Sequence, residues 1–134
     1  MTSQQIPYEK FVILIVEDEA HTRAVIKSLL RQIGVRSIVE AADGKSGLDE
    51  VMRSRPHLVF CDVHMAPVDG FAFLKLLRQS KVEAMRRTPV VFLTADSQRD
   101  TVIFAKEHQV SGYLVKPVSL GSLKARLDAV LKPV

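Results

Sequence analysis

The sequence predicts a doubly wound α/β domain, in which five parallel β-strands alternate with helices that cover both faces of one sheet. Five short apolar runs stand at fairly regular intervals along the 134 residues, and helical patterns of apolar residues follow them. Four of the runs are almost continuous in Val, Ile, Leu and Phe, as expected for strands that are buried on both faces. Five strand–helix units with short connections predict a parallel sheet with right-handed crossovers.

The expected elements alternate along the chain. The strands are predicted at Phe11–Val16, Ser37–Ala41, Leu58–Cys61, Val90–Thr94 and Tyr113–Val115. The helical stripes consist of apolar residues three or four positions apart: Ile26, Leu29, Leu30 and Ile33; Leu48, Val51 and Met52; Phe71, Leu74 and Leu77; Val102 and Ala105; and Leu120, Leu123, Leu127 and Val130. Asp43, Asp69 and Ser119 are expected to cap the helices that follow them, and Gly34 is expected to end the first helix.

The composition is that of one globular domain, with 47% hydrophobic and 25% charged residues. Residues 1–10 are polar and contain Pro7, so we expect a flexible N-terminal arm before a domain over residues 11–134. The longest early apolar run is too short to cross a bilayer and no cleavable leader precedes it, so we expect a cytoplasmic protein without a membrane partner. The single cysteine, Cys61, is expected to be a small buried hydrophobe.

The basic balance of the chain raises the question of nucleic-acid binding. The net charge is +4, but the charges are scattered, and the densest groups are Arg53 with Arg55 and Arg86 with Arg87. Neither group alternates with aromatic residues or lies on a recognition helix, so we expect no nucleic-acid partner. The four histidines show no paired ligand spacing, and a histidine metal site is not expected.

Polar residues follow the predicted strands at the edge where an α/β sheet carries its function. The first strand ends in Glu17–Glu19, the third in Asp62, the fourth in Thr94–Asp96 and the fifth in Lys116. Clustered carboxylates repel each other unless a cation joins them, and oxygen ligands suit Mg²⁺ or Mn²⁺. The lysine and the hydroxyl could hold phosphoryl oxygens, which leaves Asp62 as the acceptor of an acyl phosphate. Capping of the following helices would explain any one of these residues, but not all of them together.

Several motifs resemble those of response-regulator receiver domains over about residues 11–132. They are Val16–Glu19, Asp62 followed by Met65 and Asp69–Gly70, Leu93–Ala95, and Gly112–Pro117. Each motif is weak alone, but their order along five strand–helix units makes the resemblance strong. It implies a flavodoxin-like sheet with strand order 2-1-3-4-5.

The resemblance also implies a metal site beside the phosphoryl acceptor. Asp62 is similar to the family's phospho-acceptor, and Glu17 and Asp18 are similar to its acidic pair. Asp18 would bind Mg²⁺ directly, Glu17 partly through water, and the backbone carbonyl of His64 would complete the site.

Further residues take switching and lifetime roles by the same resemblance. Lys116 would pair with a phosphoryl oxygen, and a cis bond to Pro117 would aim it inward. The Thr94 hydroxyl would move to the phosphoryl group, and Tyr113 would fill the space that it leaves. His64 and Asp96 would flank the path of the attacking water and tune the lifetime of the phosphoryl group.

The family commonly has Pro directly after the methionine, whereas this chain has Ala66 and then Pro67, so we expect a slightly altered path after Asp62. The predicted function is a single-domain phosphorylation switch that takes its phosphoryl group from a histidine kinase or phosphotransfer protein. It would catalyse its own phosphotransfer and autodephosphorylation without being an enzyme. A downstream protein would bind the face formed by the fourth helix, fifth strand and fifth helix.

Two alternatives stay open: a phosphorelay intermediate and a Mg²⁺-dependent phosphatase with an aspartyl nucleophile. Such phosphatases carry an Asp-x-Asp motif at the nucleophile, whereas this chain has His64 at the position of the second acid. They also need a domain that caps the substrate, for which 134 residues leave little room. A degenerate receiver that only binds partners is disfavoured, because the chain keeps the family's residue types at the phosphorylation site. These residues are Asp18, Asp62, Thr94 and Lys116. We expect a monomer, because Gly112 and the stretch Leu120–Ser122 stand where dimerising relatives carry an acid and an arginine.

Overall fold

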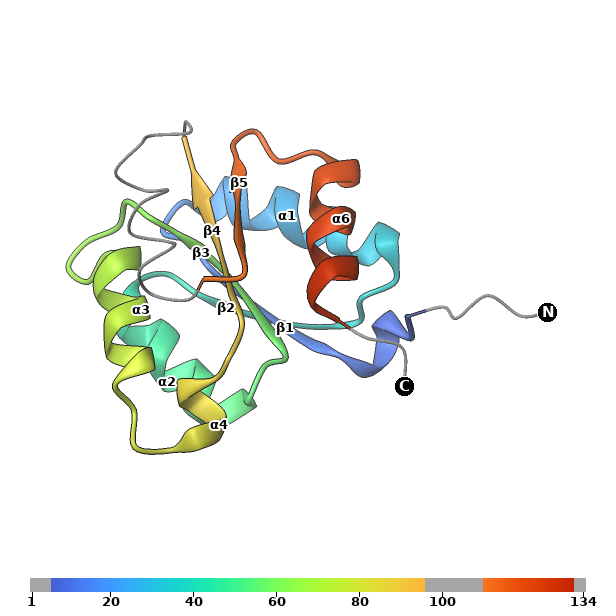
Figure 1. The fold of residues 1–134 in the computed structure, drawn as a ribbon. Coiled ribbons are helices and arrows are strands. Elements are labelled where there is room, and N and C mark those ends of the chain that lie inside the picture. The colour runs from blue at the N-terminus through green and yellow to red at the C-terminus, as the bar shows by residue number, and fades with distance from the viewer. Residues whose placement is uncertain (1–5, 96–109, 132–134) are drawn as a thin grey trace.

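The computed structural model describes residues 6–95 and 110–131, which form one five-stranded parallel sheet with helices on both faces (Figure 1). The strand order is β2-β1-β3-β4-β5, as the resemblance implied. The strands are β1 (Val12–Val16), β2 (Ser37–Ala41), β3 (Leu58–Asp62), β4 (Val90–Thr94) and β5 (Gly112–Val115). The helices in the described ranges are α1 (Ala20–Ile33), α2 (Gly44–Ser54), α3 (Gly70–Arg78), the short α4 (Glu83–Arg86) and α6 (Leu120–Val130). The helix expected around Val102 and Ala105 lies outside the described residues.

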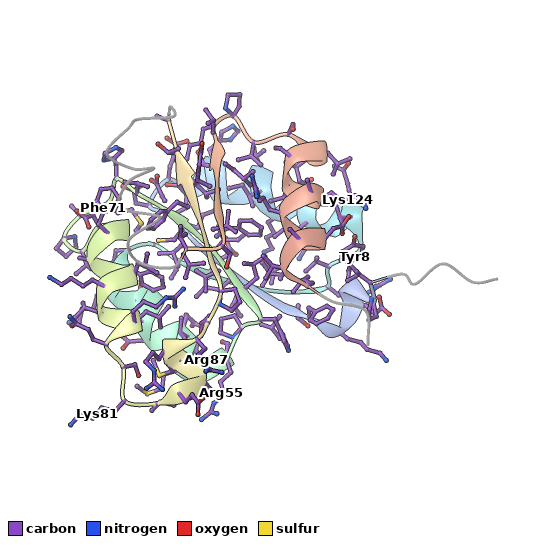
Figure 2. The ribbon with its side chains drawn as sticks, in the orientation of Figure 1. Tyr8, Arg55, Phe71, Lys81, Arg87 and Lys124 are labelled. Carbon is purple, nitrogen blue, oxygen red and sulfur yellow. The ribbon has the colours of Figure 1, made fainter. Side chains whose placement is uncertain are left out.

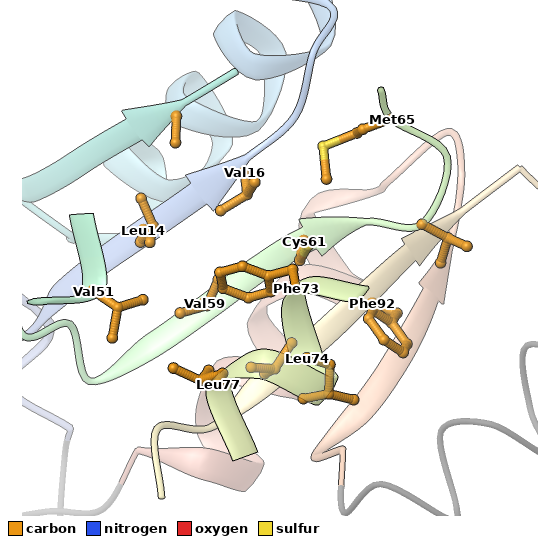
Figure 3. Close-up of a cluster of buried hydrophobic side chains, with 13 residues drawn as sticks. Leu14, Val16, Val51, Val59, Cys61, Met65, Phe73, Leu74, Leu77 and Phe92 are labelled. Carbon is orange, nitrogen blue, oxygen red and sulfur yellow. The ribbon is translucent and has the colours of Figure 1, made fainter. Parts of the chain in front are cut away.

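Two apolar layers hold the helices against the sheet, one on each face. On one face, Phe73, Leu74 and Leu77 of α3 and Val51 of α2 pack against alternate residues of the strands (Figure 3). On the other face, α1 and α6 pack against the remaining strand residues. Every residue of β3 and β4 is buried, which explains why these strands read as continuous apolar runs.

The three predicted helix caps are confirmed. The Asp43 carboxylate accepts a hydrogen bond from the Ser46 backbone, Asp69 accepts one from Ala72, and Ser119 accepts one from Ser122. Gly34 ends α1 with a φ of 126°, a conformation that favours glycine. These caps begin α2, α3 and α6 shortly after the carboxyl ends of the strands that precede them.

Two details of the helices differ from the sequence expectation. Met52 of α2 and Leu120 of α6, both assigned to apolar stripes, are 63% and 41% exposed. Each lies at the end of its stripe of apolar residues. The short helix α4 between α3 and β4 was not predicted, because four residues are too few to show a periodic pattern.

The described part of the N-terminal arm packs on the domain, in contrast to the flexible segment that we expected. Tyr8–Lys10 form one 3₁₀ turn, and Ile6 and Tyr8 pack against the α1–α6 apolar layer. The Tyr8 hydroxyl donates a hydrogen bond to the carboxylate of Asp128 in α6. This packing was not predicted, because two isolated apolar residues give no periodic signal in the sequence. The rest of the arm lies outside the described residues.

No helix in the described ranges is both long and apolar enough to span a membrane. Cys61, at the centre of the sheet, is fully buried as predicted, and burial raises the pKa of its thiol well above the ordinary range.

Candidate functional site

The carboxyl edge of the sheet brings together four of the residues that the sequence singled out. Strands β1 and β3 are neighbours, with Val16 paired to Cys61, so Glu17 and Asp62 follow directly at adjacent strand ends. Strand β4 lies on the other side of β3 and ends at Thr94. The Lys116 backbone N–H donates to the Thr94 carbonyl at 2.7 Å, which fixes the point where the lysine leaves β5.

The ammonium group of Lys116 lies between two carboxylates. Its Nζ atom is 2.5 Å from Oε1 of Glu17 and 3.2 Å from Oδ1 of Asp62. Glu17 and Asp62 are only 1% and 5% exposed. Partial burial lowers the pKa of Lys116, but the hydrogen bond to Glu17 and the charge of Asp62 outweigh it and raise the pKa overall. Lys116 therefore stays protonated across the physiological range.

Three carboxylates form a compact oxygen-ligand group beside this lysine. One oxygen from each of Glu17, Asp18 and Asp62 lies within 4.8 Å of the others. The hydrogen bond to Glu17, burial and the Glu17 charge all raise the pKa of Asp18. Hard oxygen donors this close together could hold a divalent cation such as Mg²⁺ or Mn²⁺.

Backbone contacts hold the acidic loop after β1 in place. The Glu19 N–H donates to Oε2 of Glu17 at 3.2 Å, and the Arg23 guanidinium donates to the Glu17 carbonyl at 2.6 Å. Arg23 also contacts the carboxylate of Glu40 at 3.3 Å. Sequence reasoning missed Arg23, and no spacing signal would have found it, because its role depends on where α1 crosses β1 and β2.

The segment after Asp62 is packed closely against the start of α3. The Val63 N–H donates to the Leu93 carbonyl at 3.1 Å, and the Gly70 N–H donates to the Val63 carbonyl at 2.9 Å. A Cβ atom on Gly70 would lie 2.4 Å from the Asp62 carbonyl oxygen. A glycine is therefore required where α3 begins, because the helix touches the backbone of the acceptor strand.

The remaining predicted residues lie at different distances from this centre. Thr94 is buried at the end of β4, and Tyr113 is half-buried on β5, opposite Phe92 of β4 and against the α2–α3 apolar layer. His64 is exposed two residues beyond Asp62, and Asp96 lies outside the described residues. The Lys116–Pro117 peptide is cis as the resemblance implied, and the Ala66–Pro67 peptide, in the loop where we expected an altered path, is cis as well.

A surface pocket of about 370 Å³ opens beside Lys116. It lies between the start of α1 and the connection from β5 to α6. Its lining residues are His21, Thr22, Val25, Ile26, Ala95, Lys116, Pro117 and Val118. Most of the lining is apolar, and Val25 is 41% exposed.

Comparison with known proteins agrees with this geometry. The family model described as response regulator receiver domain matches residues 13–128. The chain is 34% identical over 120 residues to the chemotaxis protein CheY-3 of Vibrio cholerae, covering 90% of this chain and 91% of that protein. It is 33% identical over 122 residues to the chemotaxis protein CheY of Pseudomonas aeruginosa, covering 91% and 97%.

Solved structures show the same fold. The chemotaxis protein CheY4 of Vibrio cholerae superposes with a TM-score of 0.82 at 28% identity, covering 90% of this chain and 98% of that one. The receiver domain of a sensor histidine kinase from Pseudomonas aeruginosa superposes with a TM-score of 0.80 at 28% identity, covering 90% and 96%, and holds a magnesium ion coordinated in its active site cleft. The sheet and the acidic edge define a CheY-like response regulator. The chain belongs to the response regulator receiver domain family.

Proposed function

We propose that this protein is a phosphorylation switch that accepts one phosphoryl group on Asp62. The observation that carries the proposal is the contact of the Lys116 ammonium with the nearly buried Asp62 carboxylate, 3.2 Å away, beside the three-carboxylate group. A buried carboxylate with a fixed cation next to it is suited to accept a group that brings negative charge of its own. If these residues only capped the helices that follow the strands, Lys116, the three acids and the Thr94 hydroxyl would not need to meet at one edge of the sheet.

In the proposed transfer, one Asp62 carboxylate oxygen attacks the phosphorus atom of the donor. A phosphorus–oxygen bond forms while the bond from phosphorus to the donor's histidine nitrogen breaks, and the imidazole takes up a proton as it leaves. Lys116 would exchange its contact with Asp62 for one with a phosphoryl oxygen. The Thr94 hydroxyl, at the neighbouring strand end, would bond a second phosphoryl oxygen.

Glu17, Asp18, Asp62 and the carbonyl of His64 are the groups that would hold a divalent cation. When bound, Mg²⁺ would neutralise the charge that the phosphoryl oxygens bring to this acidic edge. The raised pKa of Asp18 and the presence of Lys116 indicate that this edge already needs positive charge. By the resemblance, His64 and Asp96, of which Asp96 lies outside the described residues, would tune hydrolysis of the acyl phosphate by orienting or obstructing the attacking water.

The apolar pocket beside Lys116 supports docking of the donor there. A histidine kinase or phosphotransfer protein must dock close to Asp62 to deliver its phosphohistidine. Apolar contacts beside the site allow such docking without burying polar groups of either protein that lack hydrogen-bond partners. Exposed Val25 and the neighbouring Val118 offer apolar contact at the rim of the site. We infer that the donor packs a helical surface against the start of α1 and the loop after β5.

The phosphorylated form would signal to a downstream protein in the cytoplasm through β5, α6 and the segment around Val102 and Ala105, of which the last lies outside the described residues. The phosphoryl group must favour the active arrangement of Thr94 and Tyr113 over the inactive one for this to work. A relay intermediate would use the same site, so the two roles differ only in the next acceptor. A phosphatase function is disfavoured because the chain lacks the second acid after the nucleophile: Val63 and His64 follow Asp62.

The test is an intact-mass measurement after incubation with acetyl phosphate and Mg²⁺, with Asp62→Asn as the matched control. We expect the wild-type chain to gain the mass of one phosphoryl group and the variant to gain none, because the variant keeps the shape but loses the nucleophilic oxygen. Equal labelling of both proteins would refute Asp62 as the acceptor. Labelling that does not require Mg²⁺ would refute the metal site.

A further inference from the structure

A group of exposed basic side chains lies at the amino edge of the sheet, at the opposite ends of the strands from Asp62. Its members are Arg53, Arg55, Lys81, Arg86 and Arg87, and we call them the basic edge. They come from the end of α2 and from the connection between α3 and β4. Figure 2 shows Arg55, Lys81 and Arg87 along one end of the molecule. The proposed phosphoryl chemistry uses none of them.

The register of the sheet brings the two halves of the basic edge together. Val59 of β3 pairs with Val90 of β4, and the Val59 N–H donates to the Pro89 carbonyl at 2.9 Å. Arg55 stands three residues before β3, and Arg87 stands three residues before β4. Neighbouring strands lie about 4.8 Å apart, so these arginines belong to one continuous surface.

The connection that carries Arg86 and Arg87 is held in a defined conformation. The half-buried Arg78 donates from Nη1 to the carbonyls of Arg86 and Thr88, at 3.0 and 2.8 Å. The Thr88 hydroxyl donates to the Ala84 carbonyl at 3.0 Å, and the Arg86 guanidinium donates to the Ser80 carbonyl at 3.2 Å. The backbone of such a connection loses little conformational entropy when a partner binds.

Internal ion pairs leave most of this charge available. Glu50 pairs with Arg53, and Glu83 lies 3.5 Å from Arg87, but both arginine side chains remain more than three-quarters exposed. Exposed pairs of this kind contribute little energy and are easily exchanged. Within the described ranges, Arg55, Lys81 and Arg86 form no ion pair.

The neighbours of the basic edge indicate the kind of partner. Met52 and Val82, adjacent in sequence to Arg53 and Lys81, are 63% and 46% exposed. Arginine together with methionine is typical of protein interfaces. The basic edge carries no aromatic side chains on which bases could stack, which disfavours a single-stranded nucleic acid. Lipid-binding surfaces add aromatic or leucine side chains, whereas the apolar neighbours here are Met and Val.

We propose that the basic edge docks an acidic, partly apolar segment of a partner protein, with Arg55 and Arg87 as its main contacts. Guanidinium groups match carboxylates with two parallel hydrogen bonds, which suits glutamate and aspartate side chains of an extended segment. The segment binds whether or not Asp62 is phosphorylated, because the two sites lie at opposite ends of the strands. The proposal therefore stands independently of the phosphoryl transfer.

The test uses the full chain and a fluorescent eight-residue peptide of four glutamates and four leucines, titrated at low salt by fluorescence anisotropy. The double variant Arg55→Gln, Arg87→Gln should bind about tenfold more weakly than wild type, and added salt should weaken the wild-type complex. The matched control is Arg31→Gln, Lys45→Gln, which removes the same charge from two exposed positions outside the basic edge. It should bind like wild type.

Unchanged affinity of the basic-edge variant, equal loss in the control variant, or no binding of the peptide by wild type would each overturn the proposal. The glutamine analogue of the peptide should not bind, which separates charge recognition from apolar adhesion. A duplex DNA or an anionic phosphatidylserine vesicle that binds more tightly than the peptide, with the same dependence on Arg55 and Arg87, would replace the protein partner by that ligand. Urea unfolding of both variants confirms that each remains folded.

Discussion

The contact between α3 and the acceptor strand predicts a large effect of adding one methyl group at Gly70. A Cβ atom there would lie 2.4 Å from the Asp62 carbonyl oxygen, 2.9 Å from the Val63 Cα atom and 3.1 Å from the Asp62 carbonyl carbon. All three neighbours are backbone atoms, which cannot rotate away. Gly70→Ala must therefore push the start of α3 away from the strand end that carries Asp62.

The size of the effect follows from two opposing terms. Overpacking by one methyl group costs about 1–3 kcal/mol, and contacts with backbone place this site near the upper limit. Restricting the unfolded chain returns about 0.4–1 kcal/mol. We expect the free energy of unfolding to fall by about 2 kcal/mol. In α6, a Cβ atom added to Gly121 would meet no atom within 4 Å beyond its chain neighbours and the backbone of its own helix, so Gly121→Ala should instead stabilise the protein by about 0.5–1 kcal/mol.

Urea denaturation followed by circular dichroism measures both variants against wild type. With a slope of about 1.5 kcal/mol per molar urea, Gly70→Ala should unfold at a midpoint about 1.3 M lower, and Gly121→Ala at a slightly higher one. Uptake from acetyl phosphate should also slow in Gly70→Ala, because the displaced helix moves the Asp62 backbone. A Gly70→Ala midpoint within about 0.3 M of wild type would refute the close contact.

Three further predictions concern charged groups. Asp18→Ala should weaken Mg²⁺ binding by at least about tenfold in calorimetric titration, since a hard cation loses a charged ligand, and wild-type affinity would exclude that role. Lys116→Met should slow uptake from acetyl phosphate by about tenfold or more while strengthening Mg²⁺ binding, because the ammonium no longer competes for Glu17; weaker metal binding would contradict this. Tyr8→Phe should lower the free energy of unfolding by about 1 kcal/mol at pH 7. Burial raises the pKa of Asp128, but hydrogen bonds from Lys124 and Tyr8 outweigh it and lower the pKa overall. The Tyr8→Phe loss should therefore be present at neutral pH and shrink as the pH falls through this lowered pKa and Asp128 is protonated. A loss that does not change with pH would refute the contact.

The strand pattern was predictable because strands that are buried on both faces consist of consecutive apolar residues. Leu58–Cys61 and Val90–Thr94 are unbroken apolar runs, and β3 and β4 occupy these positions, with Asp62 added at the end of β3. The helix caps were equally readable, since Asp43 and Ser119 satisfy N–H groups only three residues away. The short helix α4 and the exposure of Met52 could not be predicted from the sequence, because they depend on where neighbouring elements end.

The sequence by itself determined which side chains stand at strand ends, and hence that Glu17, Asp18, Asp62 and Lys116 meet at one edge of a parallel sheet. Only the tertiary structure decided how they meet. It places the Lys116 ammonium between Glu17 and Asp62, residues 99 and 54 positions away, and it seats Tyr8 on Asp128 across 120 positions. The physical reason is that periodicity and capping record interactions within one element, whereas these contacts form between elements whose separation is set by the packing of the whole core.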